Sequence, residues 1–276
     1  MRLAIRHLTT YQYGAPVRYA ISEVRLSPRR NEYQEIHQWK VSAPAGLRAF
    51  EDGYFNACHS MTVTHPISYI DLLAQGEVST NMEAGQVILP HPKELSPYIY
   101  VNATELTQDE PKHLLRDFST IQLARIKAGG PYALEALINL ADDVATRVTY
   151  TSGSTNVNTT AIQAFLGRAG VCQDQAHVYL ACCRAHGVPA RYVSGYFYAA
   201  NAPELASHAW VDVWVEGTHG QATGWYSIDI THRCFSDERH VRLAVGKDYA
   251  SVSPIRGMRT GGGRENLSVK ISIMPV

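Results

Sequence analysis

The feature that most constrains the fold of this chain is a change in hydrophobic period near residue 109. Before it, residues 2–108 carry short β-rich runs, such as LAIRHLTTYQY and SMTVTHPISYIDLLAQGEVST, separated by Pro, Gly and Asn. Runs of this kind predict an antiparallel β-sandwich or barrel. After it, residues 112–128 and 131–146 repeat apolar residues at three- and four-residue spacing, which is typical of helices. The sequence therefore predicts a β-rich domain over residues 1–108 and a second domain over residues 109–276.

The second domain is expected to combine helices with strands. Residues 159–166 predict a short helix, and residues 172–185 predict a longer one that ends at Gly187, with Pro189 just beyond. Three strand candidates follow, at residues 191–199, 207–215 and 224–230. A last strand over residues 267–274, after a turn of three glycines, is assigned to the same domain. The predicted fold class is α+β, a sandwich-like domain followed by a core in which a helix packs on an antiparallel sheet.

Composition excludes several classes of partner. Twenty-five basic and twenty-five acidic residues give a formal net charge of zero, without a basic block, so nucleic acid is not expected to bind. We find no apolar stretch long enough to span a bilayer, and the first twenty residues do not resemble a signal peptide. A membrane partner is therefore not expected. Five cysteines without regular spacing favour reduced thiols and a cytoplasmic location.

One of these cysteines occupies a position suited to chemistry. The stretch GVCQDQAH, residues 170–177, places Cys172 between a glycine-marked turn and the start of the longer helix. A helix N-terminus offers unpaired N–H groups and a positive dipole, which stabilise a thiolate and any oxyanion formed beside it. Cys172 is thus a candidate nucleophile, and Asp174 is expected to act as a first-turn partner of the helix dipole. The other cysteines are expected to pack as small apolar residues: Cys58, Cys182, Cys183 and Cys234.

A histidine and an aspartate on neighbouring strands supply a candidate base and its partner. In SHAWVDVWV, residues 207–215, alternate residues form an all-apolar face, which must be buried and leaves His208 on the other face. If the following hairpin is symmetric about Thr218 and His219, His208 lies opposite Asp229 and can form a side-chain hydrogen bond with it. This register is an assumption, because a shift of one residue would place the two on opposite faces.

Together these residues have the arrangement of a thiolate nucleophile with a base and an orienting carboxylate. Cys172 would attack a carbonyl carbon, His208 would accept the thiol proton and later protonate the leaving amine, and Asp229 would orient the imidazole. A thioester would remain, for water or an amine to take. Two residues are assigned weakly to substrate binding: Trp210 as cleft wall or packing, and Gly195 as a point of close backbone approach or a bulge beside the site.

Four motifs in this order, GVCQDQAH, HGVPARYVSGY, SHAWVDVW and GWYSIDITH, resemble the transglutaminase-like superfamily over residues 155–232. The segments YQYGAPV, VRLSPRR and VGKDYASVSPIRGMRTGGG resemble its bacterial subgroup, in which a β-rich domain precedes the core. The resemblance implies a papain-like or transglutaminase-like core, and it maps Cys172, His208 and Asp229 onto the family's Cys-His-Asp triad. Ile230 replaces the usual Pro, and Asp212 stands where Glu is usual; neither change removes a catalytic group.

The predicted function is hydrolysis of an amide bond, peptide or isopeptide, in a peptide or protein substrate, without a cofactor or metal. Transfer of a glutamine acyl group to an amine stays open, because the triad does not decide between water and amine. A catalytically silent peptide-binding domain would leave the triad unexplained. A metal-binding module is disfavoured, because its candidate ligands lack a CxxC pair or an HExxH motif. Those ligands are Cys182, Cys183, His186, His232 and Cys234.

Overall fold

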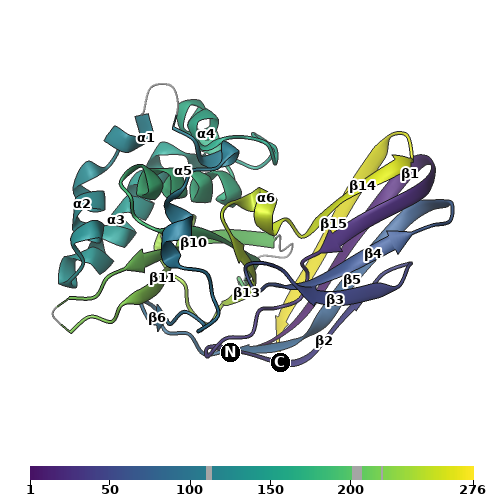
Figure 1. The fold of residues 1–276 in the computed structure, drawn as a ribbon, viewed down its shortest axis with the longest axis horizontal. Coiled ribbons are helices and arrows are strands. Elements are labelled where there is room, and N and C mark those ends of the chain that lie inside the picture. Colours follow the sequence, from purple (N-terminus) through teal and green to yellow (C-terminus); the bar gives the residue numbers. More distant parts are fainter. Residues whose placement is uncertain (110–113, 201–206, 219) are drawn as a thin grey trace.

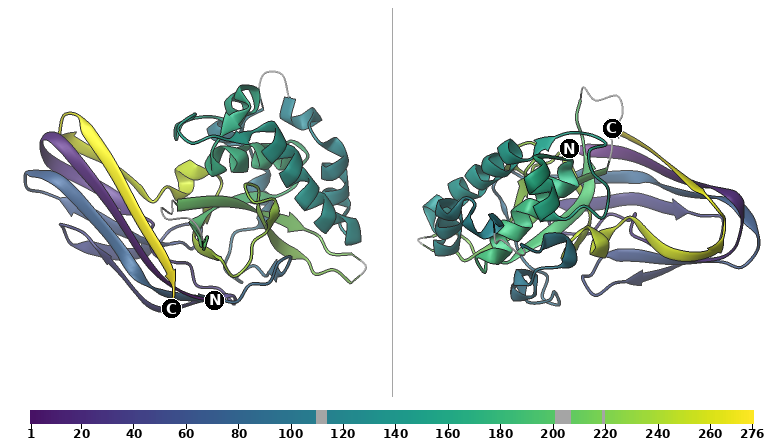
Figure 2. Two further views of the ribbon diagram at one scale, coloured as in Figure 1. Left: turned by 180° about the vertical axis from the view of Figure 1, so that it is seen from behind. Right: turned by 90° about the horizontal axis from the view of Figure 1, so that it is seen from above.

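The computed structural model describes residues 1–109, 114–200, 207–218 and 220–276. The described chain has two parts that lie side by side (Figures 1 and 2). One is a strongly bent sheet at one end of the molecule, and the other is a layer of helices over a second sheet. The predicted α+β class is confirmed. In the described ranges, no helix is both long enough and apolar enough to cross a membrane.

The bent sheet is built around one long strand, β1 (Arg2–Val24). Two segments of chain run antiparallel along the two sides of β1. On one side lie β4 (Ala57–Val63) and β5 (Ile67–Thr80), and on the other lie β14 (Ile255–Gly261) and β15 (Glu265–Pro275). The outer strands β2 (Gln34–Ser42) and β3 (Leu47–Glu51) pair with β5 and β4.

All three central segments bend at the same level. The register of β1 with β5 is interrupted between Gln12 and Val17, and β14 gives way to β15 over the glycines at 261–263, all of which have positive φ. A Cβ at Gly262 would lie 2.8 Å from the Val17 side chain, so this corner needs glycine for space as well as for conformation. The bend brings the two halves of the sheet over a shared apolar cluster, as expected of a sandwich-like domain.

The assignment of the last strand to the second domain is wrong. β15 pairs with β1 from Leu3 opposite Pro275 to Tyr13 opposite Glu265, so the C-terminal strand completes the first sheet. Conversely, β6 (Val87–Ile88) pairs with a strand of the second sheet. An alternating pattern predicts a strand but not the distant segment that it pairs with. The expected boundary between residues 108 and 109 lies next to residues 110–113, which are outside the described ranges.

The second sheet is antiparallel and lies against the helices. Its strand order is β12 (Cys234–Phe235), β11 (Gly224–Asp229), β10 (Ser207–Val215), β9 (Ala190–Phe197) and β13 (His240–Gly246). The helices are α1 (Leu114–Asp117), α2 (Thr120–Ala128), α3 (Pro131–Arg147), α4 (Ala161–Gly167), α5 (Cys172–Ala185) and α6 (Tyr249–Val252). Two short strands, β7 (Thr149–Tyr150) and β8 (Ala169–Gly170), pair in parallel, and two 3₁₀ helices span Pro97–Val101 and Glu105–Thr107.

Most helix predictions are confirmed closely. Helix α5 spans the expected residues, and α3 and α4 differ from prediction by one or two residues. The expected helix over 112–128 is two helices instead, because the chain breaks at Phe118 and Ser119, where Ser119 has a φ of 52°. Residues 112 and 113 lie outside the described ranges.

The two faces of β10 meet different surroundings. Its predicted apolar face packs with α3 and α5 in the main core: Ala209, Val211, Val213 and Val215. On the other face, Asp212 is fully buried and accepts hydrogen bonds from Arg191 at 2.8 Å and from Arg242 at 2.6 and 2.9 Å. Burial would raise the pKa of Asp212, but the two guanidinium groups lower it to about 2. Neighbouring strands are thus linked by a buried ionic contact.

The bent sheet and the second sheet also share buried polar contacts. The Asn56 side chain donates to the Val245 carbonyl and accepts from the Val245 N–H, both at 2.8 Å. The Gln34 side chain contacts the Arg242 backbone in the same reciprocal way, at 2.8 and 2.7 Å. These contacts hold β13 of the second sheet against the start of β2 and the loop that precedes β4.

Candidate active site

Cys172 is the first residue of α5, and its side chain is half-buried. The Asp174 carboxylate folds back over the start of this helix, where it accepts the Val171 N–H at 2.8 Å and the Thr155 hydroxyl at 2.6 Å. A Cβ at Gly170 would lie 2.6 Å from Asp174, so glycine is required for this contact. The expected role of Asp174 at the helix start is confirmed, and it fixes the turn that presents Cys172.

His208 and Asp229 are brought together although the expected register is wrong. The structure pairs Val211 with Ile228, and the same register continued by one pair sets Trp210, not His208, opposite Asp229. The shift from the expected register is two residues, which leaves every side chain on its predicted face. His208 Nε2 accordingly lies 2.7 Å from Asp229 Oδ2 in a buried contact, as predicted.

The electrostatics of this pair favour a charged imidazole. Burial would lower the pKa of His208, but hydrogen bonds with Asp229 and with the adjacent Cys172 side chain raise it to about 10. Burial would raise the pKa of Asp229, but hydrogen bonds from His208, His232 and His240 hold it well below its usual range. Since Nε2 donates to the carboxylate, Nδ1 of His208 is the nitrogen that remains for the thiol.

A second contact ties the helix of Cys172 to the strand end that carries Asp229. The Thr231 hydroxyl donates to the Gln175 side chain at 2.7 Å, and the Gln175 amide donates to the Val148 carbonyl at 2.8 Å. Gln175 lies one turn into α5, and Thr231 lies two residues beyond Asp229. The relative position of Cys172 and Asp229 is therefore fixed by contacts besides those of His208.

Two further histidines contact Asp229, and neither was predicted to belong to the catalytic site; His232 was considered only as a ligand of the disfavoured metal module. His232 Nδ1 lies 2.7 Å, and His240 Nε2 lies 3.0 Å, from the same Oδ2 atom that His208 contacts. His232 follows Asp229 by three residues, so its place in a turn was a usable signal. His240 comes from β13, which is not paired with β11, and only the folded sheet brings it to the carboxylate.

Trp210 and Gly195 are not available to a substrate, which corrects their assignment to substrate binding. The Trp210 side chain is 1% exposed and packs with Val193 and Val245. A Cβ at Gly195 would lie 2.2 Å from the Val241 carbonyl oxygen and 2.5 Å from the Trp210 ring. Gly195 thus permits the close approach that was predicted, and the β9–β13 register shifts at the same place.

The arrangement of the other cysteines does not support a metal module. Cys182 and Cys183 are fully buried in the apolar core, where burial raises the pKa of both thiols. His208, Asp229 and His232 do present three ligand atoms within 4.8 Å of one another. However, each of the two ring nitrogens lies 2.7 Å from Asp229 Oδ2, which is a hydrogen-bond length. Two atoms that each lie about 2.0–2.2 Å from one tetrahedral metal ion are roughly 3.3 Å apart. These residues fit a hydrogen-bonded set better than a metal centre.

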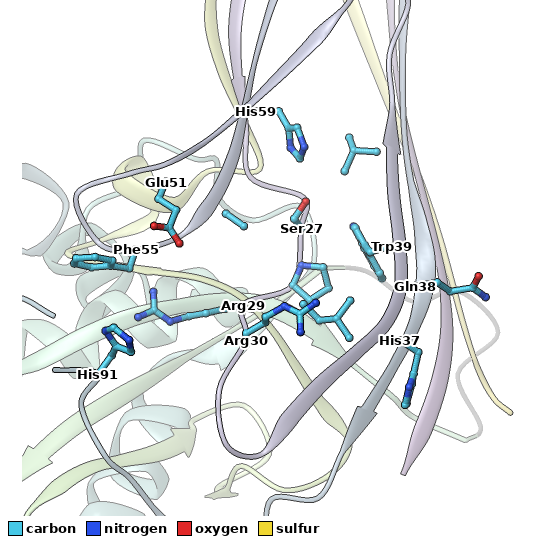
Figure 3. A pocket seen from close by; sticks show the side chains of 14 residues that line it. Ser27, Arg29, Arg30, His37, Gln38, Trp39, Glu51, Phe55, His59 and His91 are labelled. Carbon is cyan, nitrogen blue, oxygen red and sulfur yellow. The ribbon is translucent and has the colours of Figure 1, made fainter. Parts of the chain in front are cut away.

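A cavity of about 570 Å³ lies away from this site, in the N-terminal part of the chain (Figure 3). Arg30, Trp39, Phe55, His59 and His91 are among its lining residues, and neither Cys172 nor its partners belong to the lining.

Comparison with known proteins agrees with this architecture. An uncharacterized protein of Mycobacterium tuberculosis is 29% identical over 297 residues, which cover 99% of this chain and 93% of that protein. One of Mycobacterium leprae is 25% identical over 280 residues, covering 99% and 98%. A solved structure of a candidate cysteine protease from Cytophaga hutchinsonii superposes with a TM-score of 0.72 at 22% identity, covering all of this chain and 91% of that one, which shows a shared fold.

Family models match both parts of the chain. Residues 122–230, which include Cys172, His208 and Asp229, match the transglutaminase-like superfamily. Residues 3–79 match the bacterial transglutaminase-like N-terminal region. The chain therefore belongs to the transglutaminase-like superfamily and carries the bacterial N-terminal region in front of its core.

Proposed function

We propose that this protein is a cysteine-dependent amide hydrolase, acting on peptide or isopeptide bonds through Cys172, His208 and Asp229. The observation that carries the proposal is the buried 2.7 Å contact between His208 and Asp229, with the Cys172 side chain beside the same imidazole. A structural role for any one of these residues would not explain why the three converge at the start of α5.

The reaction follows from the positions of these groups. His208 Nδ1 takes the proton of the Cys172 thiol, and Asp229 stabilises the resulting imidazolium. The thiolate sulfur bonds to the carbonyl carbon, and the tetrahedral oxyanion lies near the N–H groups at the start of α5. The imidazolium then protonates the leaving amine as the C–N bond breaks. Water, deprotonated by His208, attacks the thioester and releases the acid together with the free thiol.

Acyl transfer to an amine is the second candidate, because the same thioester can react with either acceptor. The candidate cysteine protease that shares the fold supports testing hydrolysis first. A library of peptide and glutamine-containing acyl donors, incubated with and without added amines, separates the two reactions. Release of acid alone supports the hydrolase, whereas incorporation of the amine would replace it with a transferase. Binding of donors without turnover by the intact protein would instead favour a peptide-binding module.

For the location we propose a reducing compartment, the cytoplasm. All five cysteines are free thiols, and two of them, Cys182 and Cys183, are adjacent in the core. A nucleophilic thiol at Cys172 also has to remain reduced to act. Cell fractionation of the native protein tests this proposal, and recovery outside the cytoplasm would contradict it.

A further inference from the structure

One oxygen of the Asp229 carboxylate is shared by three imidazoles. Oδ2 accepts from His208 Nε2 at 2.7 Å, from His232 Nδ1 at 2.7 Å and from His240 Nε2 at 3.0 Å. We propose that His232 and His240 are positioning residues, which hold the Asp229 carboxylate in the orientation that supports the His208 imidazolium. This inference rests on the proposed function of Cys172, His208 and Asp229.

The Asp229 carboxylate requires a proton on Nε2 of His240. An ionised carboxylate only accepts hydrogen bonds, so the Nε2 atom that lies 3.0 Å from Asp229 Oδ2 is the donor. The His240 side chain is 2% exposed, and its Nδ1 is held by Asp237, whose backbone N lies at 3.1 Å and whose carboxylate Oδ1 lies at 3.3 Å. The turn from Asp237 to His240 therefore presents one N–H donor to the carboxylate, in a fixed direction.

His232 approaches Asp229 from the more open side. Its side chain is 40% exposed, and its ring stacks on Phe197 with 4.2 Å between the ring centroids. Besides the contact through Nδ1, the backbone N–H of His232 donates to the other carboxylate oxygen, Oδ1, at 3.1 Å. His232 thus holds both oxygens, and Phe197 fixes the plane of its ring.

These contacts restrict the one motion that would separate Asp229 from His208. A carboxylate on a strand end can rotate about its terminal bond, and the hydrogen bond to His208 alone would follow that rotation. With one oxygen held from three directions and the other held by a backbone N–H, the rotation is blocked. The two histidines act on the Cys172 thiol only through Asp229 and His208. Among the described residues, neither His232 nor His240 makes a hydrogen bond to that thiol.

The two histidines donate from different ring nitrogens, and this difference gives the test. The amide nitrogen of Asn occupies about the position of Nδ1, and that of Gln occupies about the position of Nε2. We therefore expect His232→Asn and His240→Gln to preserve the donor, and His232→Gln and His240→Asn to misplace it. The measurement is the alkylation rate of Cys172 by iodoacetamide from pH 5 to 9, followed by mass spectrometry of the intact protein. The melting temperature of each variant is recorded alongside.

The substitution that preserves the alkylation rate is expected to be Asn at position 232 and Gln at position 240. The donor-preserving variants keep the rate and the pH profile of the wild type, and the misplacing variants lose up to about 100-fold at neutral pH. His37→Asn, on the exposed face of the first sheet, serves as a matched histidine control. If Asn and Gln act alike at each position, or if only the melting temperature changes, the positioning role is overturned. A rate that falls when wild-type protein is treated with EDTA would overturn it too, because a cation would then be ordering the imidazoles.

The same experiment distinguishes a failure of the proposed function from a failure of the positioning role. If Cys172 in the wild type is alkylated no faster than the half-buried thiol of Cys234, the proposed function fails and the positioning role fails with it. If Cys172 is fast in the wild type and in all four variants, only the positioning role is lost.

Discussion

At the scale of single residues, the five thiols of this protein lie in very different surroundings. Burial raises the pKa of Cys58 to about 12 and that of Cys234 to about 11, and it raises those of Cys182 and Cys183 as well. Cys172 alone lies at a helix start beside an imidazole. Reactivity toward electrophiles should therefore be concentrated on one cysteine.

A limiting amount of iodoacetamide at pH 7 is expected to label Cys172 first, because the thiolate is the reactive form and burial suppresses it in the other four. Peptide mapping by mass spectrometry measures the order of labelling. Cys234→Ala is the control that should leave the overall rate unchanged. Preferential labelling of Cys182 or Cys234 would contradict the assignment of the nucleophile.

Replacement of Cys172 by Ala is expected to lower turnover by at least about 1000-fold while the protein stays folded, since only the attacking atom is removed. Turnover of the best acyl donor and the far-UV circular dichroism spectrum measure the two effects. An active Cys172→Ala variant would rule out the thioester mechanism.

The pH dependence of stability should report the raised pKa of His208. A pKa raised from 6.5 to about 10 in the folded state contributes stability that is full below pH 6.5 and is lost as the pH rises through 10. The difference in free energy of unfolding between wild type and His208→Gln is thus expected to shrink from pH 6.5 to pH 10. Urea titrations across this range measure it, and a difference that grows with pH would contradict the assigned charge.

At the scale of elements, the local sequence pattern predicted helix bounds and strand faces, but it did not predict how distant segments pair. The bounds of α5 and the two faces of β10 follow from apolar spacing within each segment, and both are confirmed. The register between β10 and β11 was wrong by two residues, because the length of a loop does not fix the turn that closes it. His240 had no local signal at all, since its partner is reached only through β9 and β10.

The strand β10 should depend strongly on Asp212. Asp212→Asn removes the carboxylate that pairs with the buried Arg242 and leaves Arg191 with only its 3.3 Å contact to Glu94. Loss of one partner from a buried ionic contact costs about 3–5 kcal/mol. Because the pKa of Asp212 in the folded protein is about 2, the stability that this carboxylate contributes is present above pH 3.8 and is lost as the pH falls toward 2. Denaturation at pH 7 and pH 3 tests both statements. An equal stability of wild type and Asp212→Asn at pH 7 would refute the first.

At the scale of the whole molecule, the two sheets are expected to unfold together. Asn56 and Gln34 make buried hydrogen bonds to β13, and β6 joins the second sheet although it follows the first in sequence. The chain is therefore not two independent domains in series. Contacts of this kind, between segments about two hundred residues apart, are what a local sequence pattern does not predict.

The four tryptophans allow this coupling to be measured. Trp39 lies in the first sheet, whereas Trp210, Trp214 and Trp225 lie in the second. In Trp39→Phe, fluorescence reports only the second sheet, while far-UV circular dichroism reports both. The urea midpoints of the two signals are expected to coincide, as for a single cooperative unit. Midpoints that differ by more than the error of the fit would show independent unfolding.

The pairing of β1 with β15 also determines when the protein can finish folding. Leu3 pairs with Pro275, and the two chain ends lie close together (Figure 1). At about 5–20 residues per second, β1 emerges from the ribosome roughly 10 to 50 s before its partner. The edge of β1 over Leu3–Tyr13 stays unpaired until β15 is translated. A product that terminates before β15 therefore displays an unpaired strand edge of the kind that promotes aggregation.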